Sequence, residues 1–191
     1  MRKVILQEWV TIDGFAAGPN GELDFFASSV LNEGSDRDLL RFIDTVDTIL
    51  LGAVTYRLFV DFWPTATTDD EIIADKLNAT PKIVFSQTLD RAPWGKWGEA
   101  KVVKTSAAEE INELKRRPGK DMVLWGSISL AQSLMKEGLI DECHLRVCPV
   151  ALGKGRRLFP DDVSTIDMKL LETRAYESGL VLLRYGRPSL A

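Results

Sequence analysis

The stretch 122–138 constrains the fold more than any other, because an apolar strand passes through a single glycine into an amphipathic helix. Met122–Trp125 is a short, wholly apolar run, which is typical of a strand covered on both faces. Gly126 permits a tight turn, and Ser127 or Ser129 can cap the following helix, whose apolar stripe consists of Ile128, Leu130, Leu134 and Met135. Such a junction directs free N–H groups and the positive end of a helix dipole at one point, which suits a phosphate group. Most junctions of this kind nevertheless bind nothing.

The rest of the chain alternates between strands and helices in the same way. Apolar runs predict strands at residues 3–11, 48–51, 82–86, 100–105 and 142–150. Helical spacing predicts helices at residues 35–47, 54–62, 69–79 and 107–116, and a turn at Ser178-Gly179 predicts a hairpin of residues 169–176 and 180–186. We therefore expect one α/β domain over residues 1–191. Its mostly parallel central sheet would carry an antiparallel C-terminal hairpin at one edge and helices on both faces.

Composition argues against several classes of protein. The net charge of −4 disfavours a general nucleic-acid-binding surface, and no apolar run approaches the roughly 20 residues of a membrane span. The apolar N-terminus is interrupted at Gln7 and Glu8, so we interpret it as the first strand rather than a signal peptide. Cys143 and Cys148 would face opposite sides of one predicted strand and could not form a disulfide. We therefore expect a reducing, cytoplasmic location.

Three predicted strands end in glycine or in residues that carry a hydroxyl group. The segments are Thr48–Tyr56, Lys82–Thr88 and Val123–Ser127. In an open α/β sheet, ligands gather at the carboxyl ends of the strands. Glycines, hydroxyls and helix N-termini at this edge suit an extended ligand with two phosphate groups. The GxGxxG and P-loop motifs are absent from the sequence, so a phosphate site here would be of another type; no metal site is predicted.

The order of five short motifs resembles that of a known family. TIDGFAAG, LLGAVTY, KIVFSQT, VLWGSISLAQSLMKEGLIDE and PVALGKGRRLF follow one another as in the dihydrofolate-reductase-like fold, and together they extend over nearly the whole chain. Trp125-Gly126-Ser127, in place of paired glycines, is more similar to one branch of it. That branch is the reductase domain at the C-terminus of the bifunctional riboflavin-pathway deaminase–reductase, together with its free-standing bacterial relatives. The zinc-deaminase signature is absent, so the resemblance concerns the reductase half alone.

The resemblance implies an NADPH-dependent reductase of a small nitrogen heterocycle, similar to 5-amino-6-(5-phosphoribosylamino)uracil reductase of riboflavin biosynthesis. A dihydrofolate-reductase-type activity on a pterin is one alternative. A non-catalytic NADP-binding protein that has lost its substrate acid is another, because a fold does not fix a function. The resemblance also implies a homodimer, with the late strands and the loop Leu152–Phe159 near the interface.

By the same resemblance, several residues would hold the phosphate groups of NADPH. Gly52 and Thr55 would lie at the pyrophosphate, at the start of the helix that follows the second strand. Gly126, Ser127 and Ile128 would form the second phosphate-binding turn. From the residues alone, Thr55 is equally well explained as a hydroxyl at a helix start.

The resemblance also places residues at the two ends of the cofactor. Ser86 would lie near the adenosine 2′-phosphate, and Ala16 and Ala17 would pass close to the nicotinamide. Ala53 stands where dihydrofolate reductases often carry a basic residue that contacts the 2′-phosphate. The preference for NADPH over NADH therefore stays open, and the residues that could replace this contact are Arg57, Lys82 and Arg91.

Two aspartates are candidates for the acid of the substrate pocket. True dihydrofolate reductases carry a carboxylate on the first helix, and the corresponding position is Asp36. An aspartate at a helix start is also a common N-cap without a chemical role. Asp13, in the segment TIDG, is the second candidate, because a similar SxDG segment borders the active site in the riboflavin branch. Asp13 could equally serve only the geometry of its turn.

Overall fold

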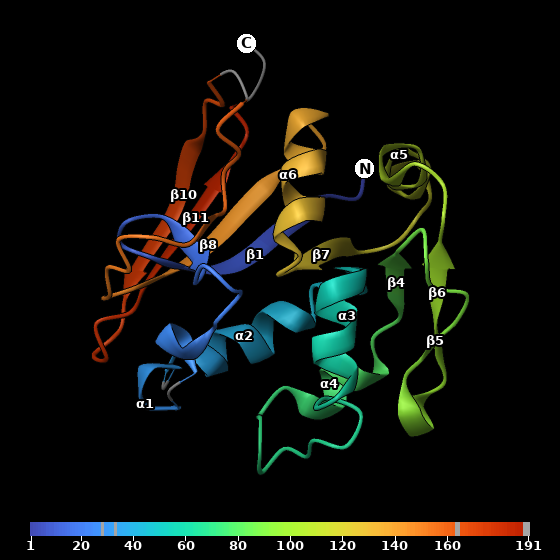
Figure 1. Cartoon of the computed structure of the whole chain (residues 1–191), viewed down its shortest axis with the longest axis horizontal. Helices are drawn as coiled ribbons and strands as arrows, with labels where there is room; N and C mark the ends of the chain where they lie inside the picture. The colour runs from blue at the N-terminus through green and yellow to red at the C-terminus, as the bar shows by residue number, and fades with distance from the viewer. Residues whose placement is uncertain (28, 33, 163–164, 189–191) are drawn as a thin grey trace.

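A computed structural model of the chain describes residues 1–27, 29–32, 34–162 and 165–188. In this part of the chain, nine strands form one sheet with β10 at one edge and β5 at the other (Figure 1). Across the sheet the order is β10 (Lys169–Ala175), β11 (Val181–Gly186), β8 (Glu142–Cys148), β1 (Val4–Thr11), β7 (Asp121–Trp125), β3 (Val46–Gly52), β4 (Lys82–Phe85), β6 (Glu99–Val103) and β5 (Ala92–Pro93). All neighbouring pairs from β8 to β6 are parallel, whereas the pairs at both edges are antiparallel. The predicted sheet with its antiparallel C-terminal hairpin is therefore confirmed.

Helices cover both faces of this sheet, as predicted. One face carries α2 (Ser35–Ile43), α3 (Ala53–Val60) and α4 (Ala74–Ala79), and the other carries α5 (Ala107–Arg116) and α6 (Ile128–Lys136) (Figure 1). Each set of helices closes a core of its own. Neighbouring strand residues alternate between the two cores, because successive side chains of a strand point to opposite faces. Val123, for example, packs in the core under α2–α4, and Leu124 packs in the core under α5 and α6.

Two helices are shorter than the sequence pattern predicts. The helix predicted at 35–47 ends at Ile43, because the backbone N–H and hydroxyl of Thr45 both donate to the carbonyl of Phe42 and the chain then joins the sheet. The helix predicted at 69–79 begins only at Ala74. Before it, the carboxylate of Asp70 accepts hydrogen bonds from the N–H and hydroxyl of Thr67, which favours a turn over a helix.

The segment between β1 and α2 contains short elements of its own. They are β2 (Phe15–Ala17), a 3₁₀ turn (Asp24–Phe26) and α1 (Ser29–Asn32). β2 pairs with β9 (Arg156–Arg157), so the segment after β1 and the segment after β8 form a small second sheet. This pairing holds the segment that contains Ala16 and Ala17 against the loop Leu152–Phe159.

The cysteines behave as the sequence predicts. Cys143 and Cys148 are both buried and free, and burial raises the pKa of each thiol to about 12. Both thiols therefore stay protonated and unreactive at neutral pH. Within the described ranges, no helix has the length and apolar character needed to cross a membrane.

Candidate cofactor and substrate site

The sheet opens between β1 and β7 at its carboxyl edge. The two strands pair only as far as Gln7 opposite Trp125. β7 then turns away at Gly126, whereas β1 continues to Thr11 with β8 as its one strand partner in the described part of the chain. The edge that the sequence predicts to hold a ligand therefore contains a break in the hydrogen bonding of the sheet. We call this break the sheet opening.

The N-termini of α3 and α6 converge beside the sheet opening. The backbone N–H of Gly52, just before α3, donates a hydrogen bond of 2.8 Å to the Oγ of Ser127, just before α6. A Cβ atom placed on Gly126 would lie 3.3 Å from the Cγ2 of Thr55, so the two turns are in close contact. The structure thus brings together Gly52, Thr55, Gly126 and Ser127, four of the residues that we predict to bind the cofactor.

This junction fits phosphate groups. Gly126 and Ser127 have φ values of 57° and 61°, two successive left-handed residues that direct backbone N–H groups into the turn. The Ser127 hydroxyl donates to the carbonyl of Trp125 and caps no helix N–H. Neither α3 nor α6 has a side-chain cap or an acidic residue in its first turn. Their free N–H groups and helix dipoles are therefore open to an anion.

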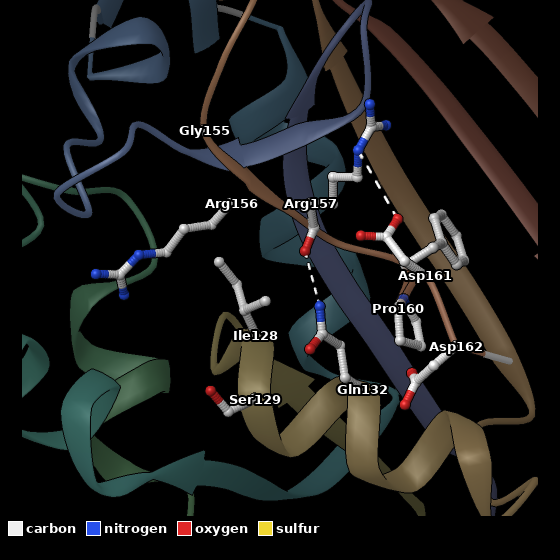
Figure 2. A pocket seen from close by; sticks show the side chains of 10 residues that line it. Ile128, Ser129, Gln132, Gly155, Arg156, Arg157, Pro160, Asp161 and Asp162 are labelled. Carbon is white, nitrogen blue, oxygen red and sulfur yellow. Dashed lines mark hydrogen bonds and ion pairs between the residues drawn. The ribbon is translucent and has the colours of Figure 1, made fainter.

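Ile128 lies at the edge of a cavity beside the first turn of α6. The cavity has a volume of about 520 Å³, and the segment 155–162 passes along it (Figure 2). The Nε2 of Gln132 donates a hydrogen bond of 2.9 Å to the carbonyl of Arg157 and so joins this segment to α6. Arg156 and Arg157 line the cavity together with Asp161, whose carboxylate lies 4.0 Å from Arg157.

The other predicted cofactor residues lie at the same edge of the molecule. Ala16 and Ala17 are buried in β2, which packs against β1. Ser86 directly follows β4, one strand away from Gly52. The Ser86 Oγ accepts hydrogen bonds from the N–H groups of Thr88 and Leu89 at 3.2 and 3.0 Å, so it also holds its own turn. A contact of Ser86 with a 2′-phosphate stays a prediction.

Glu8 is a buried acid in the sheet opening that sequence reasoning missed. Its side chain is enclosed, its Oε1 accepts a hydrogen bond of 3.0 Å from the N–H of Trp9, and its Oε2 lies 3.9 Å from the Cβ position of Gly126. Burial raises the pKa of Glu8 to about 8, so the carboxyl is largely protonated at neutral pH. The available signal was the interruption of an otherwise apolar, doubly covered strand by two adjacent polar residues, Gln7 and Glu8.

The two predicted acids have different surroundings. Asp36 lies in the first turn of α2 but is not its cap, because the N-cap position is Gly34. Burial raises the pKa of Asp36, and the nearby guanidinium of Arg146 partly opposes this. The interpretation of Asp36 as a helix cap is therefore wrong. Its role in chemistry stays a prediction.

Asp13 holds two loops together at the surface. Its carboxylate accepts hydrogen bonds from the hydroxyl of Thr11 at 2.5 Å and from the N–H groups of Leu152 and Gly153 at 3.2 and 2.7 Å. The bonds from Thr11 and Gly153 are the main reason that the pKa of Asp13 is lowered. An ionised carboxylate with these partners explains the loop geometry, and a role of Asp13 in chemistry stays a prediction.

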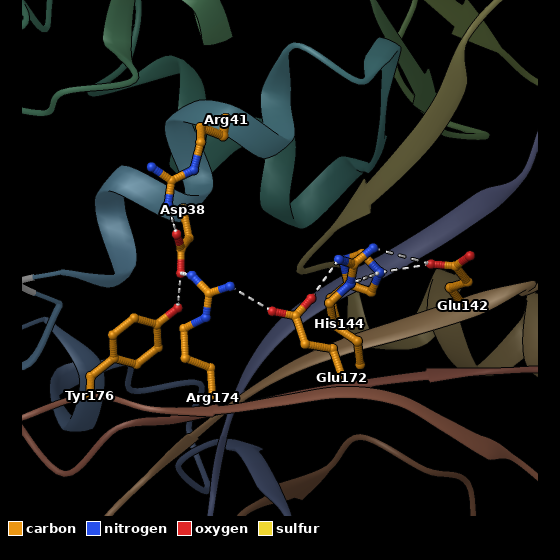
Figure 3. A network of polar contacts seen from close by, with 8 residues as sticks. Asp38, Arg41, Glu142, His144, Glu172, Arg174 and Tyr176 are labelled. Atoms are coloured by element: carbon orange, nitrogen blue, oxygen red, sulfur yellow. Dashed lines mark hydrogen bonds and ion pairs between the residues drawn. The ribbon is translucent and has the colours of Figure 1, made fainter.

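Beneath α2, polar side chains of β1 and β8 form a patch on the sheet. Trp9 lies opposite Arg146 in the strand register, and Gln7 lies opposite His144. The guanidinium carbon of Arg146 is 5.0 Å from the centre of the Trp9 ring. Toward β10 the patch continues into a paired network that extends from Asp38 to Glu142 (Figure 3). Trp9, Arg146 and Asp36 therefore gather under the start of α2, next to the sheet opening.

The sequence of this chain is similar to a known protein family and to a protein of Bacillus subtilis. The family model of the RibD C-terminal domain matches residues 2–182. "Uncharacterized protein YyaP" of Bacillus subtilis (strain 168) is 34% identical over 186 residues, which are 96% of this chain and 94% of that protein. The family resemblance inferred from the five motifs is thereby confirmed.

Two solved structures have a similar fold. One is described as a "Putative riboflavin biosynthesis protein" from Shewanella sp. PV-4; it has a TM-score of 0.78 and 23% identity, and the match covers 97% of this chain and 99% of that one. The other is a diaminohydroxyphosphoribosylaminopyrimidine deaminase/5-amino-6-(5-phosphoribosylamino)uracil reductase from Thermotoga maritima, with a TM-score of 0.66 and 14% identity. That match covers 98% of this chain but 57% of the Thermotoga chain.

Proposed function

This chain belongs to the RibD C-terminal domain family, and we propose that it is an NADPH-dependent reductase of a small pyrimidine-type heterocycle. The observation that carries the proposal is the pair of uncapped helix N-termini at the sheet opening. They offer free N–H groups to two phosphate groups, and the nicotinamide ring would lie beside them where β1 and β7 part. The reductase activity named for the Thermotoga relative supports the substrate class.

Different residues of the site would bind different parts of the ligand. Gly52, Thr55 and the turn at Gly126 would hold the pyrophosphate, and a bulkier residue at Gly126 would fill that space. Glu8, being largely protonated, adds little negative charge next to the phosphates and can donate a hydrogen bond to a ligand in the opening. When bound, NADPH supplies the hydride.

A proton must reach the substrate as well, and Asp36 is the acid on the substrate side. Trp9 lies on the α2 face of β1, where its indole contacts the Phe26 ring and the Arg146 guanidinium, and Asp36 lies in the first turn of α2 near the same guanidinium. A heterocyclic substrate would bind beside this group. Burial keeps the Asp36 carboxyl easier to protonate than an exposed aspartate, so it can hold the proton that its substrate needs.

Calorimetric titration with NADPH and an absorbance assay of NADPH oxidation test this function. We expect the protein to bind NADPH and to oxidise it with 5-amino-6-ribosylaminouracil 5′-phosphate, and to be much less active with dihydrofolate. At a ligand concentration one hundred times the dissociation constant, NADPH should stabilise the fold by about 2.7 kcal/mol. A protein that binds NADPH but turns over neither substrate would be a binder, and the absence of NADPH binding would refute the proposal.

Gly126→Val is the sharpest variant for the phosphate site. Gly126 has a positive φ and no room toward Thr55, so the variant should lose NADPH binding while its helical and sheet content stays native. Gly98→Val is the matched control, since Gly98 also has a positive φ but nothing lies within 4 Å of its Cβ position. Native NADPH affinity in a folded Gly126→Val protein would show that this turn is only structural.

We also propose that the protein is a homodimer in contact through its late strands. Leu170 and Leu171 of the edge strand β10 are each 48% exposed, more than leucines of a monomeric sheet edge need be. Light scattering at micromolar concentration should give twice the chain mass. A monomer mass would contradict this proposal and leave the proposed activity untouched.

A further inference from the structure

Two buried side-chain nitrogens lack a hydrogen-bond partner in the described part of the chain. They are the Nε2 of Gln7 and the Nε of Arg146. Gln7 is 1% exposed and Arg146 is 2% exposed, so water does not readily solvate either group. A buried donor without an acceptor destabilises the fold, and more so when it is charged. Such donors therefore point to an acceptor that arrives with a ligand.

The two groups lie together in the patch beneath α2. Gln7 and Trp9 are on the same face of β1, and Arg146 lies opposite Trp9 on β8, so Gln7 and Arg146 are diagonal neighbours. Both line a cavity of about 230 Å³ between α2 and the sheet, which can accommodate a small ring. Gln7 lies opposite Trp125 in the last pair of β1 and β7 before the sheet opening, whereas Glu8 projects from the other face of β1.

The acids around Arg146 do not neutralise it by direct pairing. The carboxylate of Asp38 binds Arg41, Arg174 at 2.6 Å and the hydroxyl of Tyr176 at 2.5 Å. Asp36 is near enough to affect Arg146 electrostatically, but no ion pair joins them in the described structure. The guanidinium instead lies against the Trp9 ring. Arg146 is thus fixed in place, charged and free to donate.

The residues around the guanidinium of Arg146 favour an uncharged hydrogen-bond acceptor over a phosphate group. The other arginines that line the cavity, Arg41, Arg174 and Arg184, are already paired with Asp38, Glu172 or Glu142, and Asp36 lies near Arg146, so the cavity has little net positive charge to hold a phosphate dianion. A ring carbonyl oxygen needs no such charge, and an amino group on the same ring could donate to Asp36. A pyrimidinone with ring amino groups has this arrangement of acceptor and donors.

We propose that Arg146, together with Gln7, binds a carbonyl oxygen of the substrate ring and thereby selects aminopyrimidinones over aminopyrimidines without a carbonyl group. The proposal rests on the proposed function for the identity of the substrate class. Arg146 would donate a hydrogen bond to the carbonyl oxygen, and Gln7 would donate a second hydrogen bond to the same edge of the ring.

Calorimetric titration with two probes tests this specificity. The probes are 5,6-diaminouracil and tetraaminopyrimidine, which have similar shapes but differ in their carbonyl groups. We expect the wild-type protein to bind the uracil at least about 10-fold more tightly, the effect of one charge-assisted hydrogen bond. Arg146→Met should weaken uracil binding roughly 10- to 100-fold and leave tetraaminopyrimidine binding unchanged. Gln7→Leu should have the same effect to a smaller extent.

Arg41→Met is the matched control. Arg41 lines the same cavity, but its side chain is 71% exposed and pairs with Asp38, so its removal should leave the preference between the probes intact. Equal wild-type affinity for the two probes, or unchanged selectivity in a folded Arg146→Met protein, would overturn the proposal. Should Arg146→Met not fold, the wild-type comparison and Gln7→Leu decide. A protein that prefers the uracil probe but neither binds nor oxidises NADPH would refute the proposed function and leave this inference standing.

Discussion

Two aspartates on α2, only two positions apart, have opposite surroundings. Asp38 is held by Arg41, Arg174 and Tyr176. Burial acts to raise the pKa of Asp38, but these three partners together keep that pKa below its usual value. Asp36 has no such partners among the described residues, and burial raises its pKa. Asp38 therefore serves the structure, and we propose that Asp36 contacts the ligand.

The same contrast holds for two buried cations. The Nζ of Lys82 donates to three backbone carbonyls, at Leu77, Asn78 and Thr80, and is fully engaged within the protein. The Nε of Arg146 is just as deeply buried and has no partner in the described part of the chain. Paired polar groups stabilise this fold, whereas unpaired ones gather where β1 leaves β7. A buried polar group therefore indicates a ligand site only when it also lacks a hydrogen-bond partner within the protein.

The largest expected effect follows from the two aspartates. Asp36→Asn should reduce turnover about 10²- to 10⁴-fold, because the proton donor is lost, while NADPH affinity stays unchanged. Asp38→Asn should keep most of the turnover and instead lower the free energy of unfolding by about 1–3 kcal/mol, since the hydrogen bonds from Arg41, Arg174 and the Tyr176 hydroxyl lose their charged acceptor. Steady-state kinetics and urea unfolding of both variants test the contrast. Equal losses of turnover would show that the two acids do not differ in role.

The next effect concerns the pH dependence of stability. The pKa of Glu8 is raised by burial to about 8, so the folded protein holds a proton that the unfolded chain releases above about pH 4.5. Stability should therefore fall as the pH rises from about 4.5 to 8, by at most about 1.4 kcal/mol per pH unit. Glu8→Gln should remove this loss.

His144, in the paired network, should act in the opposite direction. Burial lowers the pKa of His144, although the Glu142 carboxylate partly opposes it, so the unfolded chain binds more protons near pH 6.5. Stability should rise with pH through this range. Urea unfolding over a pH series, on wild type and Glu8→Gln, separates the two contributions. A Glu8→Gln protein with the wild-type decline at higher pH would show that Glu8 is ionised in the folded state.

The smallest effect is expected from the outer pairs of the network. Arg174 is 47% exposed and shares Glu172 with Arg184. Arg174→Met should change the free energy of unfolding by less than about 1 kcal/mol, because exposed ion pairs contribute little. A larger loss, measured by urea unfolding, would mean that the network acts as one cooperative unit.

The fold could be predicted from sequence because its signals are local. The apolar run at Met122–Trp125 and the helical spacing after it are found in the structure almost as predicted. Helix ends were less predictable, because at Asp70 and Thr45 side-chain and backbone bonds compete with the helix. The close approach of Gly52, Thr55 and Gly126 followed from motif order, since it needs only strands that share one edge.

The substrate side could not be predicted in the same way. Gln7 and Arg146 are far apart in sequence, and what distinguishes them among the described residues is a buried nitrogen without a hydrogen-bond partner, which no pattern of residues reports. Asp13 stays a candidate acid, and the contact of its carboxylate with two N–H groups of another loop could not be predicted from its position in the sequence. Which polar side chains have a hydrogen-bond or ion-pair partner is determined by the folded structure and not by the local sequence.

A crystal structure of the protein with NADPH tests the central claim most directly. We predict that the pyrophosphate lies at the N-termini of α3 and α6, against Gly52 and Gly126, and that the nicotinamide enters the sheet opening beside Glu8. Its reactive carbon would then face the space above Trp9, within about 3–3.5 Å of a bound substrate ring. NADPH bound elsewhere, with the opening between β1 and β7 filled by protein side chains, would contradict the claim.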